Sequence, residues 1–114
     1  MAYTEAFPVI TVSDLPAAVA FYQGIGFTEQ YRFPEEGEPV FVTLQLGTSQ
    51  LAIAAGEGAD FDLCLYADDC DAAVAQLRAA GAEVLEEPSD QPWGERMARL
   101  RDVSGHRILL LQTL

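Results

Sequence analysis

The sequence contains no lysine, a single histidine, and only two cysteines among its 114 residues. Cys64 and Cys70 are too few for a disulfide framework and lack the spacing of a metal site, so we expect both thiols to be reduced and half-buried. No apolar run approaches the roughly 20 residues that a transmembrane helix needs. The N-terminal residues show neither a basic start nor an apolar stretch, so no signal peptide is expected. The sequence therefore predicts a soluble, cytoplasmic protein.

Basic residues are scarce, and this scarcity limits the possible partners. Six arginines stand against 18 acidic residues, which gives a formal net charge of −12. Such a charge repels nucleic-acid phosphates and anionic lipids, so we expect no nucleic-acid partner and no membrane partner. It attracts a cationic partner, although salt screens this attraction beyond about 8–10 Å. Solubility, or adaptation of the host to salt, explains the acidity equally well, and this alternative stays open.

The chain is nevertheless rich in apolar residues. Half of its 114 residues are hydrophobic, which is enough for a packed core, and this length suits one compact domain. A chain of this size gains stability by burying surface against a second copy, so we expect a homodimer.

An internal repeat organises the sequence. A shift of 55 residues superimposes Asp14 on Asp69, residues 17–20 on residues 72–75, and Gly26 on Gly81. The aspartate of each copy can cap the start of a helix, and the glycine can end that helix. We interpret residues 1–114 as a single domain made of two repeats, at about residues 7–56 and 61–113.

Each repeat is predicted to fold as β-α-β-β-β. Helices are expected over residues 15–24 and 70–80, where apolar side chains recur at helical spacing. Strands are expected over residues 8–12, 27–33, 40–46 and 50–55, and then over 63–67, 83–85, 95–101 and 107–111. The fold class is α+β: two βαβββ modules forming a curved mixed sheet around a cleft, within a homodimer.

Short motifs stand at the helix and the final hairpin of these modules. They are Ser13-Asp14-Leu15, Phe21-Tyr22, Gly26-Phe27, Gln91-Pro92-Trp93-Gly94-Glu95-Arg96 and Asp102-Val103-Ser104-Gly105-His106. Together they resemble the vicinal oxygen chelate superfamily, which includes glyoxalases, extradiol dioxygenases and bleomycin-resistance proteins. The last two motifs are closest in pattern to bleomycin-resistance-type binding proteins. Val103 and His106 depart from that pattern, which usually has proline and asparagine there.

The resemblance also implies four positions at which enzymes of this family hold a divalent metal. These positions correspond to Phe7, Ala52, Asp62 and Leu109 in this sequence. Phenylalanine, alanine and leucine cannot coordinate a metal, and one aspartate alone cannot hold one with useful affinity. We therefore predict no metal and no cofactor, and we expect the cleft of the family without its shared chemistry.

Aromatic side chains suggest that this cleft binds a small molecule. Flat aromatic faces stack on planar heterocycles and attract cations. The predicted ligand-binding residues are Phe33, Phe41, Asp62, Tyr66, Trp93, Met97 and Arg99. Three other aromatic residues, Phe21, Tyr22 and Phe27, are expected to fill the core between helix and sheet. No catalytic residue is predicted, and His106 is interpreted as a solvated turn residue.

Three functions remain open at this point. The sequence favours a protein that binds and sequesters a planar, cationic, antibiotic-like small molecule without altering it. The alternative is a metal-independent or degenerate glyoxalase-like lyase or isomerase that uses Asp62 as its base. A third possibility is an accessory or sensor domain that recognises a metabolite or a partner protein.

Overall fold

The structure is a computed structural model that describes residues 1–58 and 60–114. Its elements follow the order β-α-β-β-β twice, as the repeat predicts. The chain divides into two compact units, one formed by Phe7–Phe61 and the other by Met1–Ala6 with Asp62–Leu114. No helix in the described part of the chain is long and apolar enough to cross a membrane.

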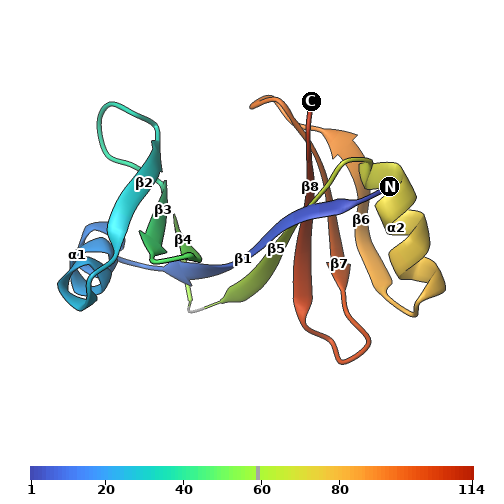
Figure 1. Ribbon diagram of the computed structural model, residues 1–114, viewed down its shortest axis with the longest axis horizontal. Helices are drawn as coiled ribbons and strands as arrows, with labels where there is room; N and C mark the ends of the chain where they lie inside the picture. The colour runs from blue at the N-terminus through green and yellow to red at the C-terminus, as the bar shows by residue number, and fades with distance from the viewer. Residues whose placement is uncertain (59) are drawn as a thin grey trace. The chain divides into compact units, whose positions relative to one another are not determined.

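The first unit is a four-stranded mixed sheet with one helix. Its elements are the part of β1 (Tyr3–Val12) from Phe7 onward, α1 (Leu15–Ile25), β2 (Thr28–Phe33), β3 (Phe41–Leu46) and β4 (Ser49–Ala55). The strand order is β2-β3-β4-β1, in which only the β4–β1 pair is parallel. Helix α1 packs on one face of this sheet (Figure 1) and buries Leu15 against Val42, Leu44 and Ile53.

The second unit repeats this plan. Its elements are β5 (Phe61–Ala67), α2 (Cys70–Ala79), β6 (Glu83–Asp90), β7 (Glu95–Arg101) and β8 (Arg107–Thr113). The strand order is β5-β8-β7-β6, again with one parallel pair, β5–β8. Helix α2 covers one face of the sheet (Figure 1). Its core contains Cys70, Ala73, Val74, Ala98, Leu100 and Leu110. The α+β class and the paired modules are thus confirmed.

The helix signals in the two repeats act as predicted. The Asp14 carboxylate accepts a hydrogen bond from the Ala17 backbone N–H (3.1 Å), and the Asp69 carboxylate accepts one from Ala72 (3.1 Å). Gly26 ends α1 with a φ of 126°, a conformation in which a Cβ atom would be strained.

Two strands, β1 and β6, are longer than the sequence predicts by five residues each. Strand β1 begins at Tyr3, five residues early, because the N-terminal segment Met1–Ala6 belongs to the second unit and bonds to the rest of it. The Ala2 carbonyl accepts a hydrogen bond from the Asp68 backbone N–H (2.9 Å), and the Tyr3 hydroxyl donates to Gln76 on α2 (2.6 Å). Strand β6 continues to Asp90 despite its proline, because two register shifts let it follow β7 as an edge strand.

One core prediction is wrong. Tyr22 and Phe27 pack against the core of the first unit, as expected, but Phe21 is 64% exposed. The apolar stripe of α1 contains Leu15 and Tyr22, and Phe21 lies about 100° away from that stripe around the helix. Its ring instead packs edge-on against Tyr22, with ring centroids 5.2 Å apart.

Candidate functional site

Each sheet has one face toward its helix and one face away from it, which we call the helix-free face. In the first unit, Val42 and Leu44 point toward α1. Side chains alternate along a strand and cross-strand partners share a face. Phe41 and its β2 partner Phe33 therefore lie together on the helix-free face, where Phe33 is 51% exposed.

The helix-free face of the second unit carries most of the other predicted residues. Ala98 and Leu100 of β7 pack toward α2, so Met97 and Arg99 point the other way. On β5 the same alternation places Asp62 and Tyr66 on that face. Trp93 stands in the turn before β7 and is 55% exposed.

The seven predicted residues therefore fall into two groups. Phe33 and Phe41 belong to the first unit, and the other five, Asp62, Tyr66, Trp93, Met97 and Arg99, belong to the second. The cleft that the sequence predicts between the modules stays a prediction.

Glu95, which the sequence interpretation missed, is the centre of a polar cluster in the second unit. Its Oε2 atom accepts a hydrogen bond from the Tyr66 hydroxyl (2.5 Å), and its Oε1 atom accepts one from the indole N–H of Trp93 (2.7 Å). We call Tyr66, Trp93 and Glu95 the aromatic–carboxylate cluster. A signal was present in the sequence, because Glu95 follows Pro-Trp-Gly directly and shares the alternation of Met97 and Arg99.

The backbone around the cluster is fixed by hydrogen bonds. The Gln91 N–H donates to the Glu95 carbonyl (2.7 Å), and the Gly94 N–H donates to the Gln91 carbonyl (3.1 Å). Gly94 has a φ of 96°, which favours glycine at this turn. The Leu114 N–H donates to the Gly94 carbonyl (3.0 Å). These bonds place Trp93 beside Glu95 and reduce the entropy that a ligand would have to remove.

Burial and negative charge keep the neighbouring side chains protonated. Burial, followed by the hydrogen bond to Glu95 and the charge of Glu95, raises the pKa of Tyr66 well above its usual range, so its hydroxyl remains a donor. Burial also raises the pKa of the Cys64 thiol to about 12, with further contributions from Glu95, Glu5 and Asp62. Cys64 and Cys70 are free and buried, more fully than the sequence predicts.

Asp62 is engaged by an arginine. The Arg107 Nε atom donates to Asp62 Oδ1 (2.8 Å), and an Nη atom of the same guanidinium lies 3.4 Å from Oδ2. The Asp62 side chain is only 15% exposed. Arg99 forms a looser ion pair with Glu86, at 3.5 Å. The sequence interpretation missed Arg107, although it follows the turn glycine of the last hairpin.

The four positions that correspond to the family's metal ligands fall on the helix-free faces of their sheets. Phe7 and Ala52 are buried, Asp62 bonds to Arg107, and Leu109 lies across from Cys64 on β5. In residues 1–58 and 60–114, no three His, Cys, Asp or Glu side chains form a group that could hold a metal ion.

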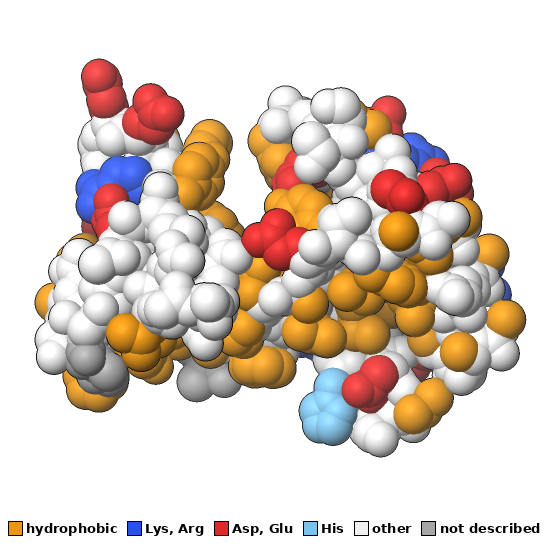
Figure 2. Space-filling view, viewed as in Figure 1, with side chains coloured by type: hydrophobic (Ala, Val, Ile, Leu, Met, Phe, Trp, Pro, Cys, Tyr) orange, Lys and Arg blue, Asp and Glu red, His pale blue; other side chains and the backbone are white. Residues whose placement is uncertain are grey.

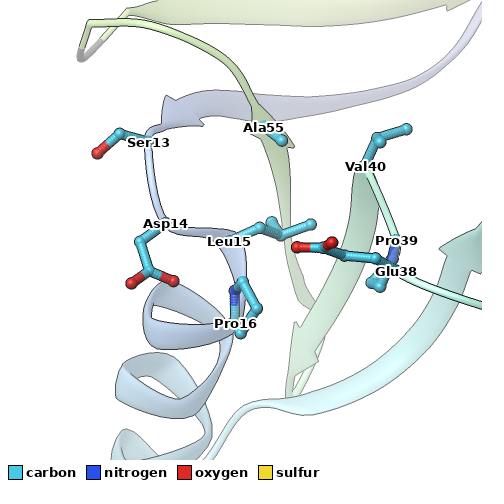
Figure 3. Close-up of a pocket in the computed structure, with 8 residues that line it drawn as sticks. All are labelled: Ser13, Asp14, Leu15, Pro16, Glu38, Pro39, Val40 and Ala55. Carbon is cyan, nitrogen blue, oxygen red and sulfur yellow. The ribbon is translucent and has the colours of Figure 1, made fainter.

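A separate groove of about 410 Å³ lies at the start of α1 (Figure 3). Its lining residues are Ser13, Asp14, Leu15, Pro16, Glu38, Pro39, Val40 and Ala55. It lies on the helix side of the first sheet, because Ala55 shares the face of Ile53 in the core below α1. Its two carboxylates are Asp14, which caps the helix, and Glu38, which reaches toward Leu15 (Figure 3). The groove is therefore distinct from the aromatic–carboxylate cluster.

His106 has no role in either place. Its side chain is 74% exposed, and its Nδ1 atom lies 3.2 Å from the Asp102 carboxylate within the β7–β8 turn. The histidine is visible at the surface beside an acidic side chain in Figure 2. Backbone hydrogen bonds from His106 and Ser104 lower the pKa of Asp102. These contacts stabilise the turn, which agrees with the interpretation of His106 as a solvated turn residue.

Two βαβββ modules, each with one helix on one face of a mixed four-stranded sheet, define the fold of the vicinal oxygen chelate class. The sequence model of the Glyoxalase/Bleomycin resistance protein/Dioxygenase superfamily matches residues 5–110. The chain belongs to this superfamily.

Individual relatives agree with this assignment. The chain is 29% identical to a bleomycin resistance protein of Klebsiella pneumoniae, over 95% of this chain and 91% of that protein. It resembles the structure of a glyoxalase/bleomycin resistance protein/dioxygenase superfamily member from Vibrio splendidus 12B01, with a TM-score of 0.74, 15% identity, and 97% and 99% of the two chains covered. It also resembles methylmalonyl-CoA epimerase from Mycobacterium tuberculosis, with a TM-score of 0.69, 20% identity, and 95% and 86% covered. At these identities the two structures support the fold alone.

Proposed function

We propose that the protein binds a planar, cationic, antibiotic-like small molecule and sequesters it without altering it. The observation that carries this proposal is the aromatic–carboxylate cluster, in which the Glu95 carboxylate is held between the side chains of Tyr66 and Trp93.

The chemistry of the cluster favours a cation. Each carboxylate oxygen of Glu95 accepts one hydrogen bond and keeps acceptor capacity for a ligand N–H group. Indole is the best aromatic partner for a cation, and the half-exposed ring of Trp93 leaves its face available for stacking. A charged hydrogen bond to Glu95 and a stacking contact with Trp93 would together orient a flat, positively charged group.

The charge of the whole chain supports the same ligand class. The net charge of −12 attracts cations. Acidic side chains are also more widespread than basic ones on the face drawn in Figure 2. The name of the Klebsiella pneumoniae relative, a bleomycin resistance protein, supports an antibiotic-like ligand.

An enzymatic role for Asp62 has less support. A general base must reach a proton of the substrate, but the Asp62 carboxylate is mostly buried and both its oxygens face the Arg107 guanidinium. We therefore rank the metal-independent lyase or isomerase second. Three other parts of the proposal stay predictions. They are Phe33 and Phe41 as further ligand contacts, the homodimer, and the cytoplasmic location.

Calorimetric titration with matched compounds tests the proposal. The panel contains bleomycin, a cationic phenanthridinium and a neutral phenanthridine analogue. We expect saturable binding of the cationic compounds, weak binding of the neutral one, and about tenfold or greater weakening of cation binding in Glu95→Gln, since hydrogen bonds to charged groups contribute about 1.5–3 kcal/mol. Glu36→Gln, which removes an acidic charge from the β2–β3 loop, is the matched control. Mass spectrometry of the recovered compound separates sequestration from catalysis, and no saturable binding across the panel would contradict the proposal.

A further inference from the structure

In the part of the chain that the structure describes, one arginine of the second unit forms no ion pair. Five arginines form ion pairs, namely Arg32 with Glu29, Arg78 with Glu87, Arg96 with Asp71 and Asp90, Arg99 with Glu86, and Arg107 with Asp62. Within the described residues, Arg101 forms no ion pair with a carboxylate, and its Nη1 atom donates to the Gly105 carbonyl instead (3.1 Å). Because acidic residues outnumber arginines three to one in this chain, the missing pair needs an explanation.

The register of the second sheet places a second arginine beside Arg101. Arg101 of β7 lies directly opposite Arg107 of β8. Both share the helix-free face with Arg99, because they follow the same alternation. Like charges directly opposite each other destabilise a sheet. Each of these arginines also faces an acidic group: Glu83 lies opposite Arg101, Asp62 bonds to Arg107, and Glu86 lies 3.5 Å from Arg99.

The arginines and the aromatic–carboxylate cluster stand at opposite ends of the same strand. Glu95 is the first residue of β7 and Arg101 is the last. A strand rises about 3.3 Å per residue, so the two side chains lie on the order of 20 Å apart along one face. Between them on the same face lie the apolar side chains of Met97, Leu109 and the buried Leu111, together with Arg99, which pairs with Glu86.

We infer that the ligand is bipolar: a planar cation binds at the aromatic–carboxylate cluster, and an anionic group of the same molecule binds at Arg101. This inference rests on the proposed binding function and adds the second end of the ligand. Guanidinium groups bind carboxylate, sulfonate or phosphate oxygens in the same bidentate manner, so these groups share the required chemistry. The net negative charge of the chain does not prevent this binding, because salt screens distant charges while Arg101 contacts the anion directly.

Tailed probes test the inference. An acridinium cation is linked by an aliphatic chain of about 15–20 Å, the distance along the face between the two ends, to a terminal carboxylate, sulfonate, phosphate or neutral carboxamide. In the wild-type protein we expect an anionic tail to tighten binding about tenfold over the carboxamide, because charged hydrogen bonds replace solvent contacts. The preferred tail identifies the anionic group.

Variants separate the two ends of the ligand. Arg101→Gln should abolish the advantage of the anionic tail and leave carboxamide binding unchanged, whereas Arg101→Lys should keep part of the advantage. Arg78→Gln, an arginine of α2, is the control, and thermal unfolding confirms that each variant folds. If the probes with anionic tails and the probe with the carboxamide tail bind equally well to the wild type and to every variant, the inference is overturned and the proposed function stands. If no acridinium probe binds, the proposed function itself fails.

Discussion

At the residue scale, two of the three side chains in the cluster could be predicted and one could not. Tyr66 and Trp93 are noticeable in a sequence because large aromatic residues on strands and turns are common binding residues. Glu95 is one of 18 acidic residues, and its role depends on a contact with Tyr66, which is 29 positions away on a strand that is not its neighbour. Only the three-dimensional arrangement distinguishes it from a solvated carboxylate.

Tyr66 should contribute to both stability and ligand binding. We expect Tyr66→Phe to lower the free energy of unfolding by about 1–2 kcal/mol, because the part-buried Glu95 carboxylate loses a hydroxyl donor. Urea unfolding measures this change. Tyr31→Phe is the matched control, since Tyr31 is half exposed on β2. Equal effects of the two substitutions would contradict the role given to the Tyr66 hydroxyl.

The two cysteines should be unreactive in the folded protein. Cys64 is 1% exposed with a pKa raised to about 12, and burial raises the pKa of Cys70 to about 11. The thiolate fraction at neutral pH therefore falls roughly a thousandfold for Cys64 and roughly a hundredfold for Cys70. We expect iodoacetamide to label both residues in denaturant but neither in the native state, as measured by mass spectrometry. Rapid stoichiometric labelling of the native protein would contradict this.

At the scale of elements, local chemistry predicts the helices well and the strands less well. Asp14 and Asp69 cap their helices by accepting hydrogen bonds from residues three positions further along the chain. Such short-range contacts can be recognised directly in a sequence. The early start of β1 depends on a bond between Ala2 and Asp68, 66 positions apart. The extension of β6 past its proline depends on register shifts against β7. Long-range pairing of this kind leaves no local signal.

The two caps should have similar energetic effects because they repeat the same geometry. We expect Asp14→Ala and Asp69→Ala each to lower the free energy of unfolding by about 0.5–2 kcal/mol. Chemical denaturation followed by circular dichroism measures both. Glu36→Ala removes the same charge from a loop without a cap, so a loss as large as that of the cap variants would show that the effect is only electrostatic.

Arg96 joins three elements, and its contacts should depend on pH. Its guanidinium donates to Asp71 in the first turn of α2 and to Asp90 of β6 (2.8 and 2.9 Å). The hydrogen bond from Arg96 lowers the pKa of Asp71. A carboxylate with a lowered pKa stabilises the fold above its ordinary pKa, and this contribution is lost as the pH falls through the lowered value.

The Asp71→Asn variant tests this pH dependence. We expect it to be less stable than the wild type at neutral pH and to approach the wild type in strong acid, where Asp71 is protonated in both the folded and unfolded states. Urea midpoints at several pH values give the comparison. A stability difference that does not change with pH would rule out the ion pair as its cause.

At the scale of the whole molecule, the internal repeat predicted the two modules. The net charge of −12 led us to predict a cationic ligand and no nucleic-acid or membrane partner. The capped helices and the strand order recur in both units, so one shift along the sequence was enough to reveal the architecture. The specific ligand could not be predicted in this way, because recognition depends on side-chain placement on one sheet face. The proposed site needs Glu95 for a cation and Arg101 for an anion, and neither was predicted from the sequence.

The fluorescence of Trp93, the only tryptophan of the chain, offers the most direct test of the central claim. The protein is titrated with copper-free and copper-loaded bleomycin at low and high salt, with Glu95→Gln beside the wild type. We predict saturable quenching with one ligand per chain, weaker binding at high salt because the attraction is screened, and strongly reduced binding in the variant. A flat titration of the folded wild type would remove bleomycin as a ligand. Quenching that is unchanged in Glu95→Gln would contradict the claim that this carboxylate binds the cation.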